Sequence, residues 1–188
     1  MSFMTAEDFE ARYRAEQDPW GYLASEYERR KYAATLAACG PGPFACALEL
    51  GASIGVFSAM LASKCDRLVT VDVSPTAVAR ARSRLANQPA VEPLLGAIPA
   101  AVPRLEFDLV VASEILYYLT DDELAGTLAL LQCTMVAGAT LVAAHWRPRG
   151  PERPRDAEEA HAALARASWL TRVEHGGTDD YLLEVYRR

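Results

Sequence analysis

The sequence lacks the features that mark several common classes of protein. Its four cysteines form no Cys-x-x-Cys pair and have no pair of histidines nearby, so neither a zinc site nor a disulfide framework is expected. It has no long block of lysine and arginine, and its formal net charge is −6, which argues against a nucleic-acid partner. The first 16 residues are charged and contain no apolar segment that could serve as a signal peptide. We therefore expect a cytoplasmic protein in a reducing compartment, with no metal site.

One stretch, residues 124–146, carries no formal charge and is long enough to span a bilayer. It also contains Gln132, three threonines and Gly138, and the glycine lies where a helix would stop and a strand would begin. We therefore predict a helix, a turn and a strand here, and no membrane span.

After residue 43 the sequence alternates between strand-like and helix-like segments, which predicts a parallel sheet with helices on both faces. The expected strands are 46–51, 67–73, 91–96, 107–113 and 139–145, and the expected helices are 54–64, 75–86 and 121–135. A helix at 156–167 and strands at 170–175 and 180–187 follow, and the turn between these strands is so short that they must form an antiparallel hairpin. The prediction is one α/β domain over residues 1–188. It has a Rossmann-like, doubly wound, mostly parallel seven-stranded sheet (44–188) and an N-terminal helical cap (1–40).

The segment 46–58 is typical of a strand, a tight turn and a helix. The turn has small residues at Gly51, Ala52, Ser53 and Gly55, which would let the backbone approach a ligand closely. Backbone N–H groups at the start of the helix would be free to face that ligand. We therefore predict a binding site at this turn.

The ligand of an open parallel sheet binds beyond the carboxyl ends of the strands, and Asp72 ends the second strand, 21 residues after Gly51. Its carboxylate could accept both hydroxyls of a ribose, or it could cap the next helix, although Ser74 already offers that cap. A dinucleotide fingerprint would need glycines at positions 51, 53 and 56, but Ser53 and Val56 are present. Glu49 would repel a pyrophosphate, whereas S-adenosylmethionine carries an ammonium and a sulfonium at its aminopropyl end. S-adenosylmethionine is therefore favoured over NAD.

The run Leu48-Glu49-Leu50-Gly51-Ala52-Ser53-Ile54-Gly55 resembles motif I of class I S-adenosylmethionine-dependent methyltransferases. Residues 69–72 resemble the acidic strand that follows it, and residues 107–119 resemble motif IV. The Glu-x-Leu-Tyr-Tyr-Leu ending of that segment, with Asp18-Pro19-Trp20 and Glu28-Arg29, is similar to the NodS group, which N-methylates the deacetylated glucosamine end of a chito-oligosaccharide. The resemblance covers roughly residues 17 to 146.

The sequence departs from the family at Ser53, where glycine is usual, and at Gly96-Ala97, where an aspartate is common. The resemblance thus implies that backbone groups of Ala97 and Ile98 contact the adenine. The residues expected to contact the donor are Trp20, Arg30, Glu49, Gly51, Ala52, Ser53, Gly55, Asp72, Val73, Ala97, Ile98, Ser113 and Glu114.

The candidate catalytic residues are Glu114, Tyr117 and His145. Glu114 could anchor the methionine end of the donor, hold an amine acceptor or cap a helix. Of Tyr117 and Tyr118, one would belong to the core and the other could contact the acceptor or the methyl group. His145 ends a strand on the expected ligand side and could be a general base, an acceptor contact or a structural residue.

Trp20, Tyr22 and one of Arg29 and Arg30 could close the cap over the donor carboxylate, with surface packing as the alternative. The sequence therefore predicts methyl transfer from S-adenosylmethionine to a small molecule, with an amino-sugar-like amine as the favoured acceptor. The alternatives are O-methylation, an NAD-dependent oxidoreductase, which the failed fingerprint disfavours, and a donor-binding domain without activity. The sequence leaves the oligomeric state open.

Overall fold

The computed structural model describes residues 3–188, so residues 1 and 2 of the expected cap lie outside the described part. The helices are α1 (Ala6–Ala15), α2 (Glu26–Ala38), α3 (Val56–Leu61), α4 (Pro75–Arg84), α5 (Asp121–Thr134) and α6 (Ala157–Arg166), with short 3-10 helices η1 (Ala62–Lys64) and η2 (Leu116–Tyr118). The strands are β1 (Ala47–Leu50), β2 (Leu68–Asp72), β3 (Val91–Leu95), β4 (Phe107–Ser113), β5 (Met135–Trp146), β6 (Thr171–Gly177) and β7 (Tyr181–Arg187).

The strands form a seven-stranded sheet in the order β3-β2-β1-β4-β5-β7-β6. Strands β1 to β5 are parallel, and β7 runs antiparallel to both β5 and β6. The predicted mostly parallel sheet with an antiparallel C-terminal hairpin is confirmed. Within residues 3–188 no helix is long and apolar enough to cross a membrane, and residues 124–146 belong to α5 and β5.

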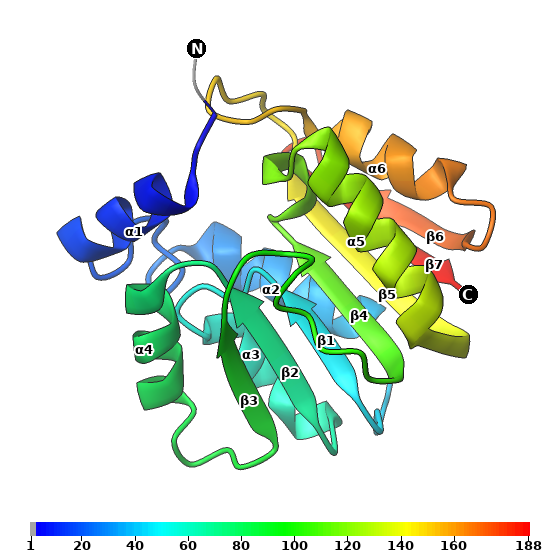
Figure 1. The fold of residues 1–188 in the computed structure, drawn as a ribbon, viewed down its shortest axis with the longest axis horizontal. Helices are drawn as coiled ribbons and strands as arrows, with labels where there is room; N and C mark the ends of the chain where they lie inside the picture. The colour runs from blue at the N-terminus through cyan, green and yellow to red at the C-terminus, as the bar shows by residue number, and fades with distance from the viewer. Residues whose placement is uncertain (1–2) are drawn as a thin grey trace.

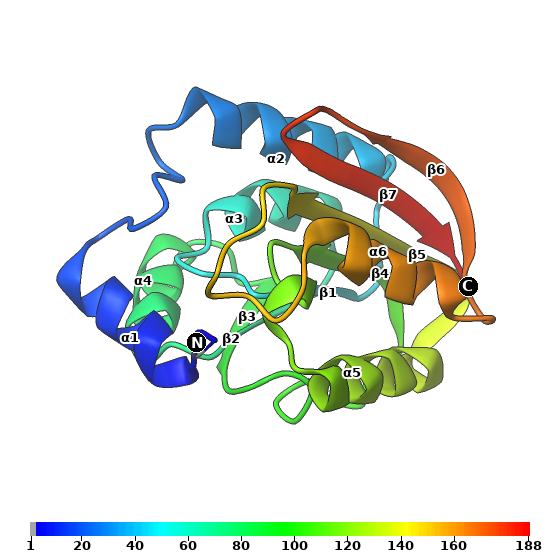
Figure 2. The same cartoon turned by 90° about the horizontal axis from the view of Figure 1, so that it is seen from above.

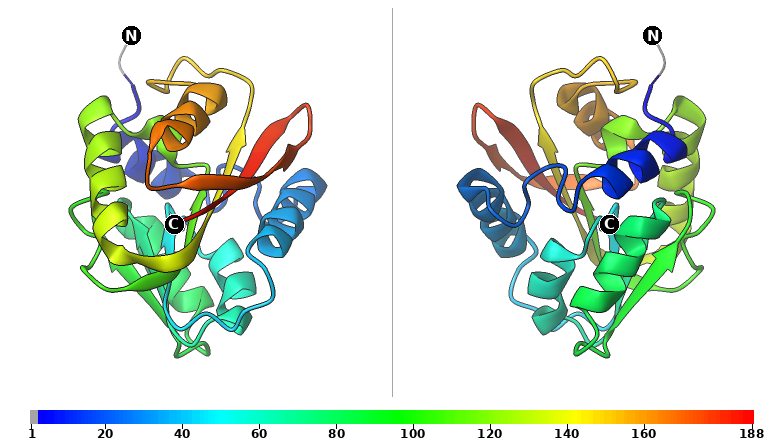
Figure 3. Two further views of the ribbon diagram at one scale, coloured as in Figure 1. Left: turned by 90° about the vertical axis from the view of Figure 1, so that its right-hand side faces the viewer. Right: turned by 90° about the vertical axis from the view of Figure 1, so that its left-hand side faces the viewer.

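Helices cover both faces of this sheet, with α2 and α3 on one face and α5 and α6 on the other (Figures 2 and 3). Alternating residues of each strand point to opposite faces, so Ala47 packs with α2 and α3 whereas Leu48 packs with α5 and α6. The buried apolar side chains thus form one cluster on each face of the sheet, and these two clusters hold the carboxyl ends of the parallel strands in fixed positions.

Most element boundaries differ by one or two residues from those predicted, and two of the differences have a clear local cause. Helix α3 begins at Val56, because Gly55 has a φ of +76° and belongs to the turn. Strand β5 begins at Met135, directly after α5, because Met135 pairs with Phe107. Gly138, where the strand was expected to begin, lies inside β5.

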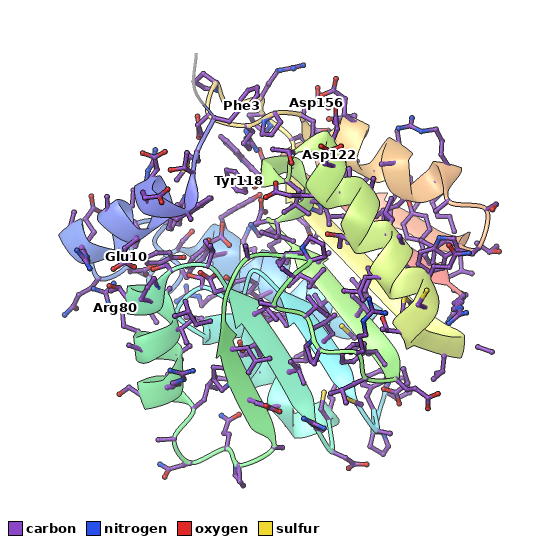
Figure 4. The ribbon with its side chains drawn as sticks, in the orientation of Figure 1. Phe3, Glu10, Arg80, Tyr118, Asp122 and Asp156 are labelled. Atoms are coloured by element: carbon purple, nitrogen blue, oxygen red, sulfur yellow. The ribbon has the colours of Figure 1, made fainter. Side chains whose placement is uncertain are left out.

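Helix α1 lies beside the edge to which the parallel strands point (Figure 1). A capping box between Thr5 and Asp8 starts it. Glu10 fixes it to the start of α4 by accepting hydrogen bonds from Ser74 Oγ at 2.6 Å and from Thr76 N at 3.0 Å (Figure 4). These charge-assisted bonds lower the pKa of Glu10 to about 2 and keep the cap in place above the strand ends.

Candidate active site

A cavity of about 840 Å³ opens at the carboxyl ends of the parallel strands, within the size range of small-molecule sites. Its walls come from the N-terminal segment, α1, α2, the ends of β1 to β4 and the loop after β5. The predicted site residues that line it are Trp20, Gly51, Ser53, Asp72, Val73, Ala97, Ile98, Glu114 and Tyr117.

The turn after β1 has left-handed backbone at Gly51 (φ +74°) and at Ser53 (φ +52°). Within the turn, the N–H groups of Gly51, Ala52, Ser53 and Gly55 are not free, because each donates to another group of the protein. A Cβ at Gly51 would lie 3.0 Å from the side chain of Ile115. Gly51 therefore permits both the turn and the close packing of the loop after β4.

Asp72 at the end of β2 fastens this turn. Its Oδ2 accepts from Ser53 N at 2.8 Å and its Oδ1 accepts from Ser74 N at 3.0 Å. Burial raises its pKa, although the backbone N–H groups that it accepts from oppose that shift. Each carboxylate oxygen still has a lone pair available, so Asp72 can also accept the two hydroxyls of a ribose.

Aromatic residues of the cap close the cavity above the turn. The buried Tyr13 donates from its hydroxyl to Ser53 Oγ at 2.5 Å. The ring of Trp20 lies 5.1 Å from that of Tyr13 and 6.1 Å from that of Phe9, and Phe9 meets Tyr118 edge to face. The predicted lid residue Trp20 therefore lies within an aromatic cluster over the site.

The acidic part of the cavity is built around Lys31, which the sequence analysis missed. Lys31 is 1% exposed, and its Nζ lies 3.0 Å from Glu28 Oε1 and 2.5 Å from Glu114 Oε1. Glu114 has a φ of +56°, and its carboxylate also accepts hydrogen bonds from Tyr117 Oη and from Trp146 N at 3.1 Å. A single cation thus lies between two carboxylates at the wall of the cavity.

The expectation that His145 faces the ligand is wrong. His145 is 0% exposed and points toward α6, because it shares a face of β5 with Ala143. Its Nε2 accepts from Leu116 N at 3.0 Å, and its Nδ1 lies 3.0 Å from Nε2 of His161. Burial and the neighbouring His161 hold the pKa of His145 well below its usual value. His145 is therefore a neutral, internally bonded residue.

Several residues predicted to contact the donor do not line the cavity: Arg30, Glu49, Ala52, Gly55 and Ser113. Arg30 is exposed and pairs with Glu26 in its own helix. Glu49 is buried and accepts from Ser58 Oγ at 2.5 Å, and burial raises its pKa to about 8. The carboxyl of Glu49 therefore faces α3 and not the cavity, so the predicted repulsion of a pyrophosphate does not hold.

The sheet order, the cavity at the strand ends and the acidic residue that ends β2 together define a class I methyltransferase fold. The structure of the N-methyltransferase NodS from Bradyrhizobium japonicum WM9 in complex with S-adenosyl-L-homocysteine is similar, with a TM-score of 0.87 and 28% identity. It covers 97% of this chain and 97% of that one. A methyltransferase candidate from Pseudomonas syringae is 35% identical, with a TM-score of 0.76 over 87% of this chain and 100% of that one.

The family model for nodulation protein S (NodS) matches residues 5–149, which is most of the sequence. This chain belongs to the NodS family. Nodulation protein S of Sinorhizobium fredii is 35% identical over 111 residues, which are 58% of this chain and 51% of that protein. The chain spans about half the length of the curated relatives that it matches.

Proposed function

We propose that this protein transfers the methyl group of S-adenosylmethionine to an amine of a small acceptor, with an amino-sugar unit as the favoured acceptor. The observation that carries the proposal is that one cavity joins Asp72, at the end of β2, to the carboxylates of Glu28 and Glu114. Membership of the NodS family and the relative that binds S-adenosyl-L-homocysteine support the choice of donor.

The residues present fit such a donor. Asp72 would accept the ribose hydroxyls, and Val73, Ala97 and Ile98 would flank the adenine. Gly51 leaves the wall beside Asp72 free of a side chain. When bound, the donor supplies an electrophilic methyl group on its sulfonium, and the aromatic cluster around Trp20 would keep water away from it.

An amine acceptor must be unprotonated when its nitrogen bonds to the methyl carbon and the carbon–sulfur bond breaks. Glu28, Lys31 and Glu114 together carry one net negative charge when ionised, which attracts an ammonium. Burial raises the pKa of Glu28, and its Oε2 has no hydrogen-bond partner within residues 3–188, so Glu28 is the proposed proton acceptor.

Tyr117 has another task in this scheme. Burial and the neighbouring Glu114 raise its pKa well above the usual value, so its phenol stays protonated and donates to Glu114. Tyr117 therefore orients the carboxylate rather than removing a proton.

Calorimetric titration with S-adenosyl-L-homocysteine and, separately, with NAD tests the donor class. Mass spectrometry of glucosamine and of N-acetylglucosamine after incubation with methyl-deuterated donor tests the acceptor atom. We expect binding of S-adenosyl-L-homocysteine alone and labelling of glucosamine alone. Failure to bind S-adenosyl-L-homocysteine would overturn the proposal, and labelling of N-acetylglucosamine would indicate O-methylation. Donor binding without transfer to either sugar would favour a domain that binds the donor without turnover.

A further inference from the structure

The loop between β5 and α6 places a second cation in the wall of the cavity. Among residues 3–188, the buried lysine and arginine side chains are Lys31, Arg153 and Arg155. Lys31 pairs with two glutamates, and Arg155 pairs with Asp121 at 2.5 Å. Arg153 is 3% exposed, and no carboxylate oxygen of the described residues lies within 4.0 Å of its guanidinium nitrogens. A buried charge without a counter-ion is costly unless a ligand supplies one.

Two aromatic rings hold the guanidinium of Arg153 in place. Its central carbon lies 4.3 Å from the ring centre of Tyr117 and 5.3 Å from that of Trp146. Its Nη2 donates to the carbonyl of Pro148, while its Nε is buried without a partner in the part of the chain that the structure describes. The rings stabilise the cation but carry no charge that could pair with it, and the nearby carboxylate of Glu152 forms no ion pair with it.

The loop itself is anchored on both sides of the cavity. Arg155 donates to the carbonyl oxygens of Leu116 and Leu119. Met4 N donates to Glu152 O at 2.9 Å, which joins the loop to the N-terminal segment, as Figure 1 shows at the same end of the molecule. Arg153 is therefore fixed in the wall before any ligand arrives. It also lies beyond residue 149, where the family match ends.

We propose that Arg153 binds an anionic oxygen group, a phosphate or a carboxylate, on the methyl acceptor, so that the acceptor carries both an amine and an anion. This inference rests on the proposed methyl transfer. Tyr117 supports the pairing of the two charges, because its hydroxyl contacts Glu114 and its ring contacts Arg153. A guanidinium suits such a group because its N–H donors match the geometry of a carboxylate or phosphate. Glu152 also lines this wall and would repel an oxyanion, so the oxyanion must bind guanidinium N–H groups that face away from the carboxylate of Glu152.

The test is calorimetry with S-adenosyl-L-homocysteine present, using glucosamine, glucosamine 6-phosphate and glucosaminic acid as probes. The phosphate and carboxylate arms separate the two sources of the anion. We expect at least one anionic probe to bind about 10- to 100-fold more tightly than glucosamine. Arg153→Gln should abolish that preference, whereas Arg149→Gln, an exposed arginine of the same loop, should keep it.

Three results would overturn the inference: neither anionic probe binds more tightly than glucosamine, Arg153→Gln keeps the preference, or Arg153→Gln weakens S-adenosyl-L-homocysteine binding by the same factor. The last result would mean that Arg153 binds the methyl donor. A lower melting temperature of Arg153→Gln with an unchanged preference for the anionic probe would mean that Arg153 serves packing alone. Failure of the proposed methyl transfer is detected by two other assays. These are titration with S-adenosyl-L-homocysteine without an acceptor, and mass spectrometry of glucosamine after incubation with the labelled donor.

Discussion

Replacing Lys31 with methionine is the sharpest test of the charged cluster at the cavity wall. Methionine keeps much of the side-chain volume but removes the cation between Glu28 and Glu114, so two buried carboxylates lose their shared partner. Breaking a buried ion pair by removing one partner costs about 3 to 5 kcal/mol. For a domain of this size that cost corresponds to a fall in melting temperature of about 6 to 20 °C.

The effect should depend on pH in a defined direction. Burial raises the pKa of Glu28, and once Glu28 is protonated the variant no longer holds two like charges together. The difference in unfolding free energy between wild type and Lys31→Met should therefore be larger at pH 8 than at pH 5. Urea unfolding at the two pH values measures it.

Arg30→Met is the matched control, because Arg30 is the preceding residue of α2 and forms an exposed pair with Glu26. Arg30→Met should lower the free energy of unfolding by less than about 1 kcal/mol and leave the affinity for S-adenosyl-L-homocysteine unchanged. The double variant Lys31→Met/Glu114→Gln should recover part of the lost stability, because it removes one of the two facing carboxylates. Equal effects of Lys31→Met and Arg30→Met, or a cost that does not change with pH, would refute the reasoning.

Three further outcomes follow from the same structure. Asp72→Asn should weaken S-adenosyl-L-homocysteine binding by about 1 to 3 kcal/mol in calorimetry, and unchanged affinity would remove Asp72 from the site. Glu10 should hold α1 in place above pH 4.5, and this contribution to stability should be lost as the pH falls toward 2. Hydrogen exchange of the α1 amides measures the loss. Unchanged protection of these amides in Glu10→Gln would contradict the prediction. The pKa of folded His145 lies below the unfolded value of 6.5, so its contribution to the free energy of unfolding should be complete above pH 6.5. Below pH 6.5 the free energy of unfolding should fall by at most about 1.4 kcal/mol per pH unit because of His145. His145→Gln should reduce this slope.

The order of elements could be predicted from the sequence because strand and helix periods differ and because the glycine turn and Asp72 mark two strand ends. The sequence did not predict the face of the sheet to which a residue near the end of a strand points. Glu49 lies on the face that α3 covers and accepts from Ser58, and His145 lies on the face that α6 covers. Each lies one residue before the end of its strand, where neighbouring residues point to opposite faces of the sheet.

A signal for Lys31 was present in the sequence. Positions 28, 31, 32 and 35 of α2 are the buried ones, and this spacing of three and four residues marks one face of a helix. The neighbouring Arg29 and Arg30 lie on the exposed face of the same helix. Arg153 had no comparable signal, because it lies in an irregular loop whose path depends on contacts with Leu116 and Leu119.

The C-terminal hairpin lies beyond the matched family segment but still reaches the cavity through a directed chain of hydrogen bonds. Leu116 N donates to Nε2 of His145, so the proton of this neutral ring must be on Nδ1 and is donated to Nε2 of His161. The proton of His161 is then on Nδ1, which lies 2.9 Å from Glu184 Oε2 in β7. Each ring therefore has one allowed tautomer. Glu184 thereby fixes the loop that carries Glu114 and Tyr117, so the geometry of the acidic wall depends on a strand that contributes no residue to the cavity.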